Sequence, residues 1–389
     1  MIPELTPLEL LAGLESAAPP QVLDVRARER AAQGHIVAHD YHNVAGSELA
    51  RFADPAQAGL DRGRPVAVVC DRGFSSRQVT AWLRRRGFEA RSLAGGMQRW
   101  MLTAARREVR GIAGLDLLLQ FDRFGKGALG HLAVAGAATS SSGTGREALA
   151  IDPGRDLEPW LAALAESDAR LVGVVDTHCH ADYLSGGPAL AQATGAPYRI
   201  HPADARDPYE RGSARAARFS FEPLSDGEQI VVGGARFVVE HLPGHTEGSV
   251  ALRLGDELAF TGDLLFVASI GRPDLADRTA EWTEQLWASL VRIRREWPAE
   301  LRVFPAHYGS EAERRADRVV AGRFGELLSH NVPLAISDVE SFRRWVGERV
   351  GDAPEVYRRI KRANLGLVAV DEELADELEA GKSQCALTT

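Results

Sequence analysis

Two histidines and an aspartate, His178, His180 and Asp182, stand at alternate positions shortly after an apolar run, residues 171–175. Such a run bounded by polar residues predicts a buried strand. In extended backbone, residues i, i+2 and i+4 project to one face, so the three side chains converge at the end of that strand. Neutral imidazole suits zinc, iron, copper and nickel, and the pattern therefore predicts a metal site. The alternative, incidental histidines at a polar strand end, is disfavoured by three potential ligands on one face.

Cys70 is the second candidate for chemistry. It follows an apolar run, residues 66–69, and precedes a loop, residues 71–75, and a helical pattern, residues 76–86. Ligands of open α/β sheets bind at this edge, where loop amides and a helix N-terminus stabilise an anion. Such surroundings lower the pKa of a thiol and hold a thiolate or persulfide sulfur, whereas the alternative is a buried structural cysteine. The predicted sulfur-binding loop consists of Asp71, Arg72, Gly73, Phe74 and Ser75.

The elements that position Cys70 belong to a first domain, expected at residues 1–105. Strand patterns at residues 22–25 and 66–69 alternate with helical patterns, which predicts a small parallel α/β sheet. Residues 106–111 are rich in arginine and have little apolar pattern, so we expect a linker there.

The histidine motif belongs to a second domain, expected at residues 112–315. Strand pairs within residues 230–239 and 251–260 alternate with helical patterns. A serine- and glycine-rich stretch, residues 139–145, predicts a hairpin tip, because no Lys-Ser/Thr follows it as in a phosphate loop. Residues 316–389 are mostly helical in pattern and are expected to form an extension that packs on this domain.

The composition and net charge limit which kinds of protein and partner are expected. Of 389 residues, 45% are hydrophobic and 26% are charged, which is an ordinary balance for a soluble chain with two domains. The net charge of −8 provides no global basic field, so we expect neither nucleic acid nor a membrane as partner. Three cysteines cannot form a disulfide framework, and the sequence shows no leader and no apolar run of membrane-spanning length. These features predict a cytoplasmic protein.

The histidine motif resembles the HxHxDH signature of the metallo-β-lactamase superfamily. Its downstream landmarks follow in order: Pro-Gly-His-Thr around His245, Thr-Gly-Asp ending at Asp263, and Pro-Ala-His ending at His307. Together they cover about residues 112 to 310. The resemblance implies an αββα sandwich with its metal site at the sheet edges. The sequence departs from the family at Tyr183, where the signature has its last histidine.

The resemblance also implies a ligand set. Zinc hydrolases of this fold, including thioesterases similar to glyoxalase II, use Asp182, the residue at Tyr183 and His307 for a second metal. A phenol is a poor ligand unless it is ionised, since its pKa is ~10, so the tyrosine favours a single metal.

One branch of this fold, the persulfide dioxygenases, works with one Fe(II) held by two histidines and an aspartate. Carried onto this sequence, the ligands are His178, His245 and Asp263. This set leaves coordination positions open for a persulfide sulfur and O2. One Fe(II) per chain is therefore expected, with zinc as the alternative. The neighbouring groups, expected to tune the metal and orient substrate or to hold a second metal, are His180, Asp182, Tyr183 and His307.

Arg272 is a further candidate for the second site, where it would bind substrate, whereas the two remaining cysteines are not expected to take part. Arg272, in a Gly-Arg-x-Asp stretch that recurs in this branch, either receives a carboxylate of a thiol cofactor or forms an ion pair with Asp274. Cys179 alternates away from the ligand face and is expected to pack in the interior. Cys385 is expected to be an exposed thiol in a flexible terminus.

Residues 5–103 resemble the rhodanese sulfurtransferases. The landmarks are Leu-Asp-Val-Arg at 23–26, Gly-His-Ile at 34–36, the Cys70 loop and Leu-Ala-Gly-Gly-Met at 93–97. Many members carry arginine at the position of Ser75, and His39-Asp40 replaces the usual Gly-Ala. Arg72 and Arg77 are candidates to supply the missing positive charge, and substrate choice is left open.

The combination predicts an enzyme of sulfur metabolism. It would oxidise a low-molecular-weight thiol persulfide with O2 to sulfite and thiol, and carry sulfane sulfur on Cys70. The expected partners are therefore small molecules: a thiol persulfide, thiosulfate or sulfite, and O2. Two alternatives remain, a zinc-dependent thioester hydrolase of the glyoxalase II type and a non-catalytic sulfur carrier or sensor. The identity of the thiol, the direction of sulfur flow and the oligomeric state are not determined by the sequence.

Overall fold

The structure, a computed structural model, describes residues 2–136, 145–210 and 216–387. The chain divides into two compact units. The first comprises residues 1–105 with two short segments, 123–126 and 379–382, and the second comprises the rest. Apart from those segments, the first unit ends at residue 105.

The first unit contains a five-stranded parallel sheet with the strand order β1-β5-β4-β2-β3. All four residues of its central strand β4 are buried, since alternate side chains enter apolar clusters on the two faces. Ala67 and Val69 lie in one cluster, whereas Val66, Val68 and Cys70 lie in the other. The strands are β1 (Glu4–Leu5), β2 (Gln21–Asp24), β3 (Tyr41–Asn43), β4 (Val66–Val69) and β5 (Ala90–Leu93). The helices are α1 (Pro7–Leu14), α2 (Arg28–Gln33), α3 (Gly46–Leu49), the 3-10 helix η1 (Pro55–Ala58), α4 (Phe74–Arg84) and α5 (Gly96–Leu102).

The second unit contains two sheets. The seven-stranded sheet has the order β12-β11-β10-β9-β8-β7-β6, with β9, β10, β11 and β12 parallel to one another. Its strands are β6 (Ala105–Val109), β7 (Leu117–Arg123), β8 (Ala128–Gly136), β9 (Arg146–Ile151), β10 (Ala169–Val175), β11 (Tyr198–Ile200) and β12 (Glu222–Pro223). The six-stranded sheet runs β13-β14-β15-β16-β17-β18 and is mainly antiparallel. Its strands are β13 (Gln229–Val232), β14 (Ala235–His241), β15 (Val250–Leu254), β16 (Leu258–Gly262), β17 (Arg302–Pro305) and β18 (Gly322–Arg323).

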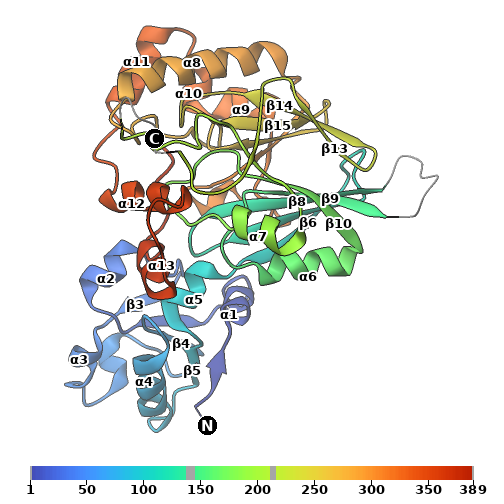
Figure 1. The fold of residues 1–389 in the computed structure, drawn as a ribbon. Helices are drawn as coiled ribbons and strands as arrows, with labels where there is room; N and C mark the ends of the chain where they lie inside the picture. Colours follow the sequence, from blue (N-terminus) through green and yellow to red (C-terminus); the bar gives the residue numbers. More distant parts are fainter. Residues whose placement is uncertain (1, 137–144, 211–215, 388–389) are drawn as a thin grey trace. The chain divides into compact units, whose positions relative to one another are not determined.

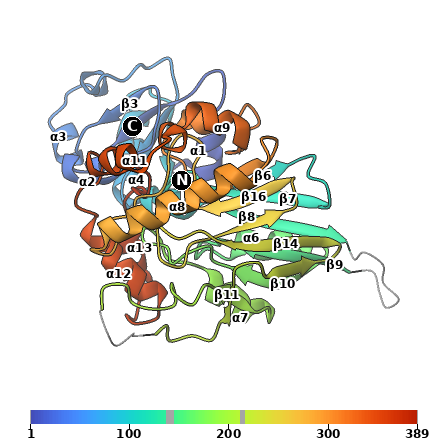
Figure 2. The same ribbon diagram turned by 90° about the horizontal axis from the view of Figure 1, so that it is seen from above.

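The two sheets pack face to face, and helices cover their outer faces (Figures 1 and 2). Side chains from both sheets form one core; Leu149 and Val175 come from the first sheet and Phe237 and Phe260 from the second. On the outer face of the first sheet, α6 (Glu158–Ser167) and α7 (Gly187–Thr194) follow β9 and β10. On the outer face of the second sheet, the 18-residue helix α8 (Thr279–Glu296) buries its apolar side. This is the αββα sandwich that the resemblance implied.

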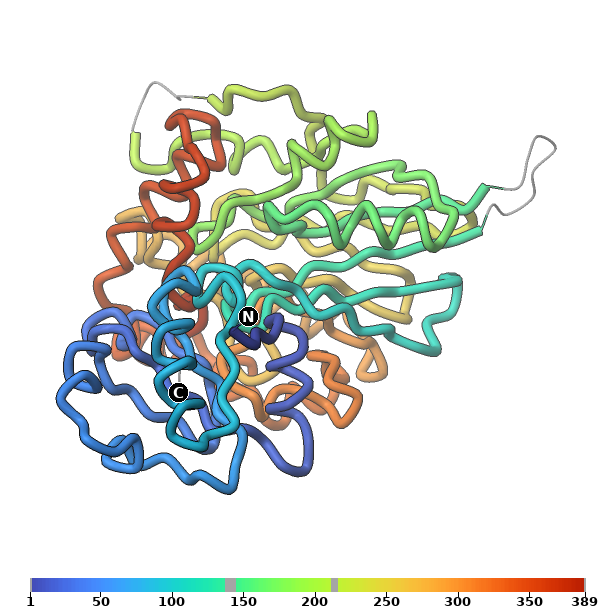
Figure 3. Tube along the Cα trace, turned by 90° about the horizontal axis from the view of Figure 1, so that it is seen from below, coloured from blue at the N-terminus to red at the C-terminus, as the bar shows by residue number. Residues whose placement is uncertain are grey.

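The C-terminal part of the second unit is helical, as expected. A short 3-10 helix, η2 (Glu311–Glu313), precedes it, and the helices are α9 (Phe324–His330), α10 (Val332–Ala335), α11 (Val339–Gly347), α12 (Glu355–Asn364) and α13 (Glu372–Leu378). In Figure 3 the red trace of α12 runs beside the loops that follow β10 and β11. The amide of Asn364 donates to the carbonyls of His180 and Tyr183, both at 2.9 Å. The C-terminal helical extension is therefore hydrogen-bonded directly to the backbone of the histidine motif.

Several local expectations differ from the structure. The predicted linker, residues 106–111, largely belongs to β6, an edge strand of the seven-stranded sheet. Helix α4 begins at Phe74 rather than at residue 76, directly after the left-handed turn at Gly73. Residues 139–144 of the serine- and glycine-rich stretch lie outside the described residues. Within the described ranges, none of the helices is both long and apolar enough to cross a membrane.

Candidate metal centre and sulfur-carrying cysteine

Four segments of the second unit carry the predicted metal ligands to one place. Residues 177–183 follow β10, His245 lies between β14 and β15, Asp263 follows β16, and His307 follows β17. Backbone hydrogen bonds hold neighbouring segments in register: the amide of residue 250 donates to the carbonyl of residue 177, and that of 306 to that of 262, both at 2.9 Å. Pairing between strand ends thus gathers ligands that are far apart in the sequence.

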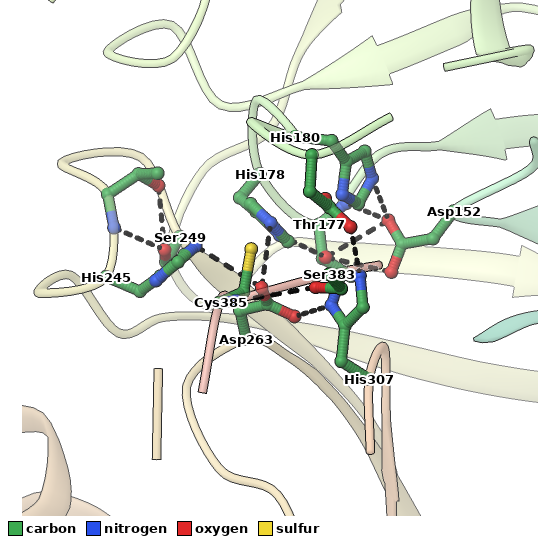
Figure 4. Close-up of polar contacts among 12 residues, drawn as sticks. Asp152, Thr177, His178, His180, His245, Ser249, Asp263, His307, Ser383 and Cys385 are labelled. Carbon is green, nitrogen blue, oxygen red and sulfur yellow. Dashed lines mark hydrogen bonds and ion pairs between the residues drawn. The ribbon is translucent and has the colours of Figure 1, made fainter. Parts of the chain in front are cut away.

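Three buried atoms face one another: Nε2 of His178, Nε2 of His245 and Oδ2 of Asp263 (Figure 4). The carboxylate oxygen lies 3.6 Å from the His178 nitrogen and 3.3 Å from the His245 nitrogen. None of the three atoms has a hydrogen-bond partner among the described residues. Burial lowers the pKa of His245 to about 4 and that of His178 well below its usual value, so both imidazoles are neutral. Two neutral imidazole nitrogens and a carboxylate oxygen, all buried and facing one another without partners in the described structure, fit a divalent metal.

Partners behind the two imidazoles fix which nitrogen faces this centre. Nδ1 of His245 donates to the carbonyl of Arg272 at 2.9 Å. Nδ1 of His178 donates to Oγ1 of Thr177 at 3.0 Å, and the Thr177 hydroxyl in turn donates to Asp152 at 2.9 Å. Each Nδ1 therefore carries the proton, and each Nε2 presents a lone pair to the metal. Thr177 and Asp152 were not singled out by the sequence reasoning, although Thr177 stands next to the motif.

Gly271 allows the chain after β16 to pass close behind the ligands. A Cβ atom at this position would lie 2.0 Å from the carbonyl oxygen of Asp263 and 2.8 Å from Nδ1 of His245. Both distances are too short for any side chain, so the residue before Arg272 must be glycine. The same segment then supplies the Arg272 carbonyl that orients His245.

His307 lies between two carboxylates. Its Nδ1 is 2.6 Å from Oδ1 of Asp263 and its Nε2 is 2.9 Å from Oδ2 of Asp182. Burial lowers the pKa of His307, but attraction to Asp182 and Asp263 outweighs that effect and raises it to about 10. The protonated ring therefore links the first ligand trio to Asp182.

Cys385 joins Asp182 and His307 in a second buried group whose ligand atoms lie within 4.8 Å of one another. The expectation of an exposed thiol in a flexible terminus is wrong, because the side chain is only 1% exposed. Residues 385–387 bond to residues 270–272 in an antiparallel arrangement, which carries the thiol to the ligands (Figure 4). Burial raises the pKa of the Cys385 thiol well above its usual value, and Asp182 and Asp263 raise it further.

The other members of the motif face away from the first trio. His180 lies in a third buried group with Asp152 and Asp176, and its Nε2 is 3.2 Å from Asp152. The ring of Tyr183 stacks on His180 at 4.3 Å, and the two side chains form a hydrogen bond of 3.0 Å. Burial lowers the pKa of His180, but the nearby carboxylates, Asp152 first, raise it above its usual value. The rings of His178 and His180 touch, with 4.2 Å between their centroids, but the two histidines belong to different groups of ligand atoms, although one motif carries both.

Arg272 forms the ion pair that was one of its two expected roles. Its Nε and Nη2 donate to the two carboxylate oxygens of Asp274 at 2.6 and 2.7 Å. Nη2 also donates to the carbonyl of Gly351 at 2.8 Å. Hydrogen bonds to Asp274 raise the pKa of Arg272; burial lowers it, but with the charge of Asp274 the pKa stays above its usual value. Cys179 is interior as expected, and burial raises the pKa of its thiol to about 12.

In the first unit, Cys70 lies at the carboxyl end of β4, as predicted. The amide of Gly73 donates to its sulfur at 3.1 Å, and the Ser76 hydroxyl lies 3.2 Å from the same atom. Burial raises the pKa of the Cys70 thiol, but hydrogen bonds from Ser75, Ser76 and Gly73 outweigh it and leave the pKa below its usual value. The sulfur is therefore held as an anion would be held, at the start of α4.

Residues that begin in the Leu-Ala-Gly-Gly-Met landmark hold the Cys70 loop through backbone hydrogen bonds. The amide of Met97 donates to the carbonyl of Cys70 at 2.8 Å, and the amide of Gln98 to that of Asp71 at 3.1 Å. A Cβ atom on Gly96 would lie 2.3 Å from the Cys70 carbonyl oxygen, so the close approach requires glycine. Of the two arginines considered for the missing positive charge, Arg77 pairs instead with Glu4 at 2.7 Å.

Comparisons with known proteins agree with both resemblances. Residues 143–313 match the family described as the metallo-beta-lactamase superfamily, and residues 6–103 match the rhodanese-like domain. An uncharacterized protein of Aquifex aeolicus is 34% identical over 192 residues, which cover 47% of this chain and 88% of that protein.

A curated relative and a solved structure are also similar to the second unit. A hydroxyacylglutathione hydrolase of Pseudomonas aeruginosa is 38% identical over 168 residues, covering 42% of this chain and 58% of the hydrolase. Among solved structures, ETHE1 from Myxococcus xanthus aligns with a TM-score of 0.51 and 25% identity, covering 68% of this chain and 99% of that one. The chain is thus a member of the metallo-beta-lactamase superfamily that also carries an N-terminal rhodanese-like domain.

Proposed function

We propose that the second unit oxidises a low-molecular-weight thiol persulfide with O2, giving sulfite and the free thiol, at one iron held by His178, His245 and Asp263. The balanced reaction is RSSH + O2 + H2O → RSH + SO3²⁻ + 2H⁺, in which the outer sulfur is oxidised and O2 is reduced. The observation that carries the proposal is the set of two lone-pair nitrogens and one carboxylate oxygen that face one another without partners.

The chain's own residues hold this set in place. Thr177 and the Arg272 carbonyl keep the protons of His178 and His245 on Nδ1. His307 occupies Oδ1 of Asp263, so that Oδ2 faces the two imidazoles. Iron held by these three residues would supply the binding of an anionic sulfur and the activation of O2. All three ligands are buried, so the atoms that would hold the iron are shielded from bulk water.

We further propose that Cys70 carries sulfane sulfur in the first unit. Its thiolate attacks the outer sulfur of thiosulfate, the S–S bond breaks, and sulfite leaves with the bonding electron pair: Cys70–S⁻ + S2O3²⁻ → Cys70–S–S⁻ + SO3²⁻. The Gly73 amide and the hydroxyls of Ser75 and Ser76 stabilise the anion in both states. The lowered pKa of Cys70 supports the role of nucleophile.

The test of the oxidation is O2 uptake by the full chain reconstituted anaerobically with Fe(II), using persulfides of several low-molecular-weight thiols. Asp263→Ala should lose both the iron and the uptake. Cys70→Ser should keep the uptake but lose the single sulfur that mass spectrometry finds on Cys70 after thiosulfate treatment. No uptake from any persulfide by iron-loaded protein would refute the proposal, and a sulfur adduct on Cys385 in place of Cys70 would refute the assignment of the carrier.

A thioester hydrolase is the second candidate. It is favoured by the 38% identity to a hydroxyacylglutathione hydrolase and by the group of Asp182, His307 and Cys385 beside the first trio. The same protein loaded with zinc should then hydrolyse S-lactoyl thioesters of low-molecular-weight thiols. Hydrolysis without O2 uptake would establish this alternative, and neither activity with either metal would leave the sulfur carrier or sensor.

A further inference from the structure

We propose that the buried ammonium of Lys361 and the indole N–H of Trp282 form a binding site for a small oxyanion beside the metal trio. Lys361 lies on α12 and Trp282 lies on α8, and each residue is only 1% exposed. Nζ of Lys361 lies over the Trp282 ring, 5.6 Å from its centroid. Two hydrogen-bond donors from distant helices thus belong to one contact inside the second unit.

Neither donor has a hydrogen-bond acceptor among the described residues. The buried Nε1 of Trp282 is without a partner in that part of the chain. The ammonium of Lys361 forms neither a hydrogen bond nor an ion pair with the described residues, and its contact is the aromatic face of Trp282. A buried ammonium without a counter-charge is costly, and a cation–π contact recovers only part of that cost. Both donors therefore require an acceptor, and the ammonium requires an anionic one.

Lys361 differs in this respect from the other cations of its helix. Those cations each form an ion pair with a carboxylate, at 2.8 to 3.5 Å, and are Arg358, Arg359 and Arg362. Lys361 instead shares the buried side of α12 with Tyr357 and Ile360. Positions three and four residues apart lie on one face of a helix, so the lysine points into the interior together with Tyr357. Its charge is therefore left for a ligand to balance.

Helix α12 is attached to the metal motif, which gives Lys361 a fixed place beside it. Three residues after the lysine, the Asn364 amide donates to the carbonyls of His180 and Tyr183, both at 2.9 Å. The thiol of Cys179 faces the carbonyl of Lys361 itself at 3.9 Å. The backbone around the lysine is thus held against the loop that carries the first metal ligand.

The ammonium also lies within electrostatic reach of the trio. Burial lowers the pKa of His245, and the positive charge of Lys361 lowers it further. The same charge lowers the pKa of His178, after burial and the neighbouring imidazoles. Trp282 packs in one apolar cluster with Ala181 of the histidine motif. An anion bound by the two donors would therefore lie beside the ligands of the metal.

The chemistry of the two donors indicates the class of ligand. An ammonium and an indole N–H can only donate, so the ligand must offer acceptor oxygens and a negative charge. Each of the two candidate reactions releases such an anion: sulfite from persulfide oxidation, and a carboxylate from thioester hydrolysis. The choice of sulfite rests on the proposed oxidation, whereas the anion site itself does not. We expect sulfite, because it carries up to two negative charges.

The test is a titration of the zinc-loaded full chain with sodium sulfite and, separately, with sodium lactate. A Cys70→Ser background prevents sulfite from reacting with sulfur on the first unit. Calorimetry gives the affinity, and the indole ¹H–¹⁵N resonance of Trp282, assigned by its absence in Trp282→Phe, reports on the site. We expect sulfite to bind and to move this resonance. Lactate binding in its place would support the same site and assign it to the hydrolysis.

Lys361→Met keeps the apolar body of the side chain but removes its charge. It should weaken sulfite at least about tenfold, because a hydrogen bond to a charged group is lost, and should abolish the shift of the Trp282 resonance. Arg359→Met is the matched control, since it removes a cation from the exposed side of the same helix. It should leave the affinity unchanged.

Equal affinities of Lys361→Met and the parent protein would overturn the proposal, because the metal alone would then hold the anion. Absence of binding by both sulfite and lactate would overturn it as well. Lys361→Gln is the second variant if Lys361→Met does not fold, as judged by circular dichroism. It also lacks the charge and should weaken sulfite, and an unchanged affinity would contradict the proposal.

Thermal unfolding provides a second measurement. A ligand that binds only the folded state stabilises it, so sulfite should raise the melting temperature of the parent protein more than that of either Lys361 variant. Equal increases would contradict the role of the ammonium. Failure of the proposed oxidation is a different result. It would appear as absent O2 uptake by iron-loaded protein, whatever the sulfite titration shows.

Discussion

Nδ1 of His307 lies 2.6 Å from Oδ1 of Asp263, and this contact decides which carboxylate oxygen faces the metal ligands. Oδ2 is left 3.3 Å from Nε2 of His245 and without a hydrogen-bond partner in the described structure. His307 therefore acts on the first trio by orienting Asp263. It is also the side chain that connects this trio with Asp182.

Removing that contact should weaken the metal. We expect His307→Ala to lower the affinity of the first trio for Fe(II) about 10- to 100-fold, as is typical when a partner of a metal ligand is lost. The measurement is competition with a metal chelator under anaerobic conditions. The control is His330→Ala, because His330 lies on the exposed part of α9. Equal affinities of the two variants would contradict the orienting role.

The hydroxyl of Thr177 should matter through the tautomer of His178. Thr177→Val keeps the shape but removes the acceptor that holds the proton on Nδ1 and the donor to Asp152. We expect metal affinity to fall about tenfold, with loss of the downfield imidazole NH resonance of His178 in the metal-loaded protein.

The control for that variant is Thr283→Val, since the Thr283 hydroxyl donates to the Thr279 carbonyl within α8, outside the centre. It should leave both the affinity and the resonance unchanged. If Thr177→Val behaved like the control, another group would fix the orientation of His178.

The reactivity of Cys70 should extend to lower pH than that of an ordinary thiol. Its folded-state pKa is lowered, so in the folded protein the thiolate persists below the pKa of the unfolded chain. The stability that its hydrogen bonds contribute is complete above the unfolded pKa and is lost as pH falls through the folded pKa. Ser75→Ala should shift the midpoint of iodoacetamide alkylation upward by about one pH unit, because a hydrogen bond to a charged group contributes roughly 1.5–3 kcal/mol.

Peptide-resolved mass spectrometry assigns that alkylation to Cys70 rather than to the other two cysteines. The exposed Ser47 of α3 is the matched control, and Ser47→Ala should leave the midpoint unchanged. A Ser75→Ala midpoint equal to that of the parent would show that Ser75 does not hold the sulfur.

Arg272 and Asp274 should stabilise the fold as a pair. Both charged groups are buried and bonded at 2.6 and 2.7 Å, so breaking the pair from either side should cost about 3–5 kcal/mol. Arg272→Gln and Asp274→Asn should therefore lower the free energy of unfolding by similar amounts in urea denaturation. If Arg272→Gln raised KM for the persulfide and left stability unchanged, the arginine would bind substrate instead.

Much of the site could be predicted from local sequence. The apolar run before His178 and the run before Cys70 determine buried strands, and the loops that follow such strands lie at the sheet edge where ligands bind. The His178 motif and the landmarks at His245, Asp263 and His307 could be recognised because each is a short run of adjacent residues. The loop of Cys70 could be recognised for the same reason, since its residues are neighbours in the chain.

Only the tertiary structure decided which of these residues share a metal. One motif contains both His178 and His180, yet in the loop after β10 the first faces Asp263 and the second faces Asp152. Cys385 is separated from Asp182 by most of the second unit's length, and nothing in its own sequence neighbourhood indicates a ligand. It reaches the centre because backbone hydrogen bonds attach the tail to residues 270–272, and contacts between distant segments depend on the packing of the whole unit rather than on local pattern.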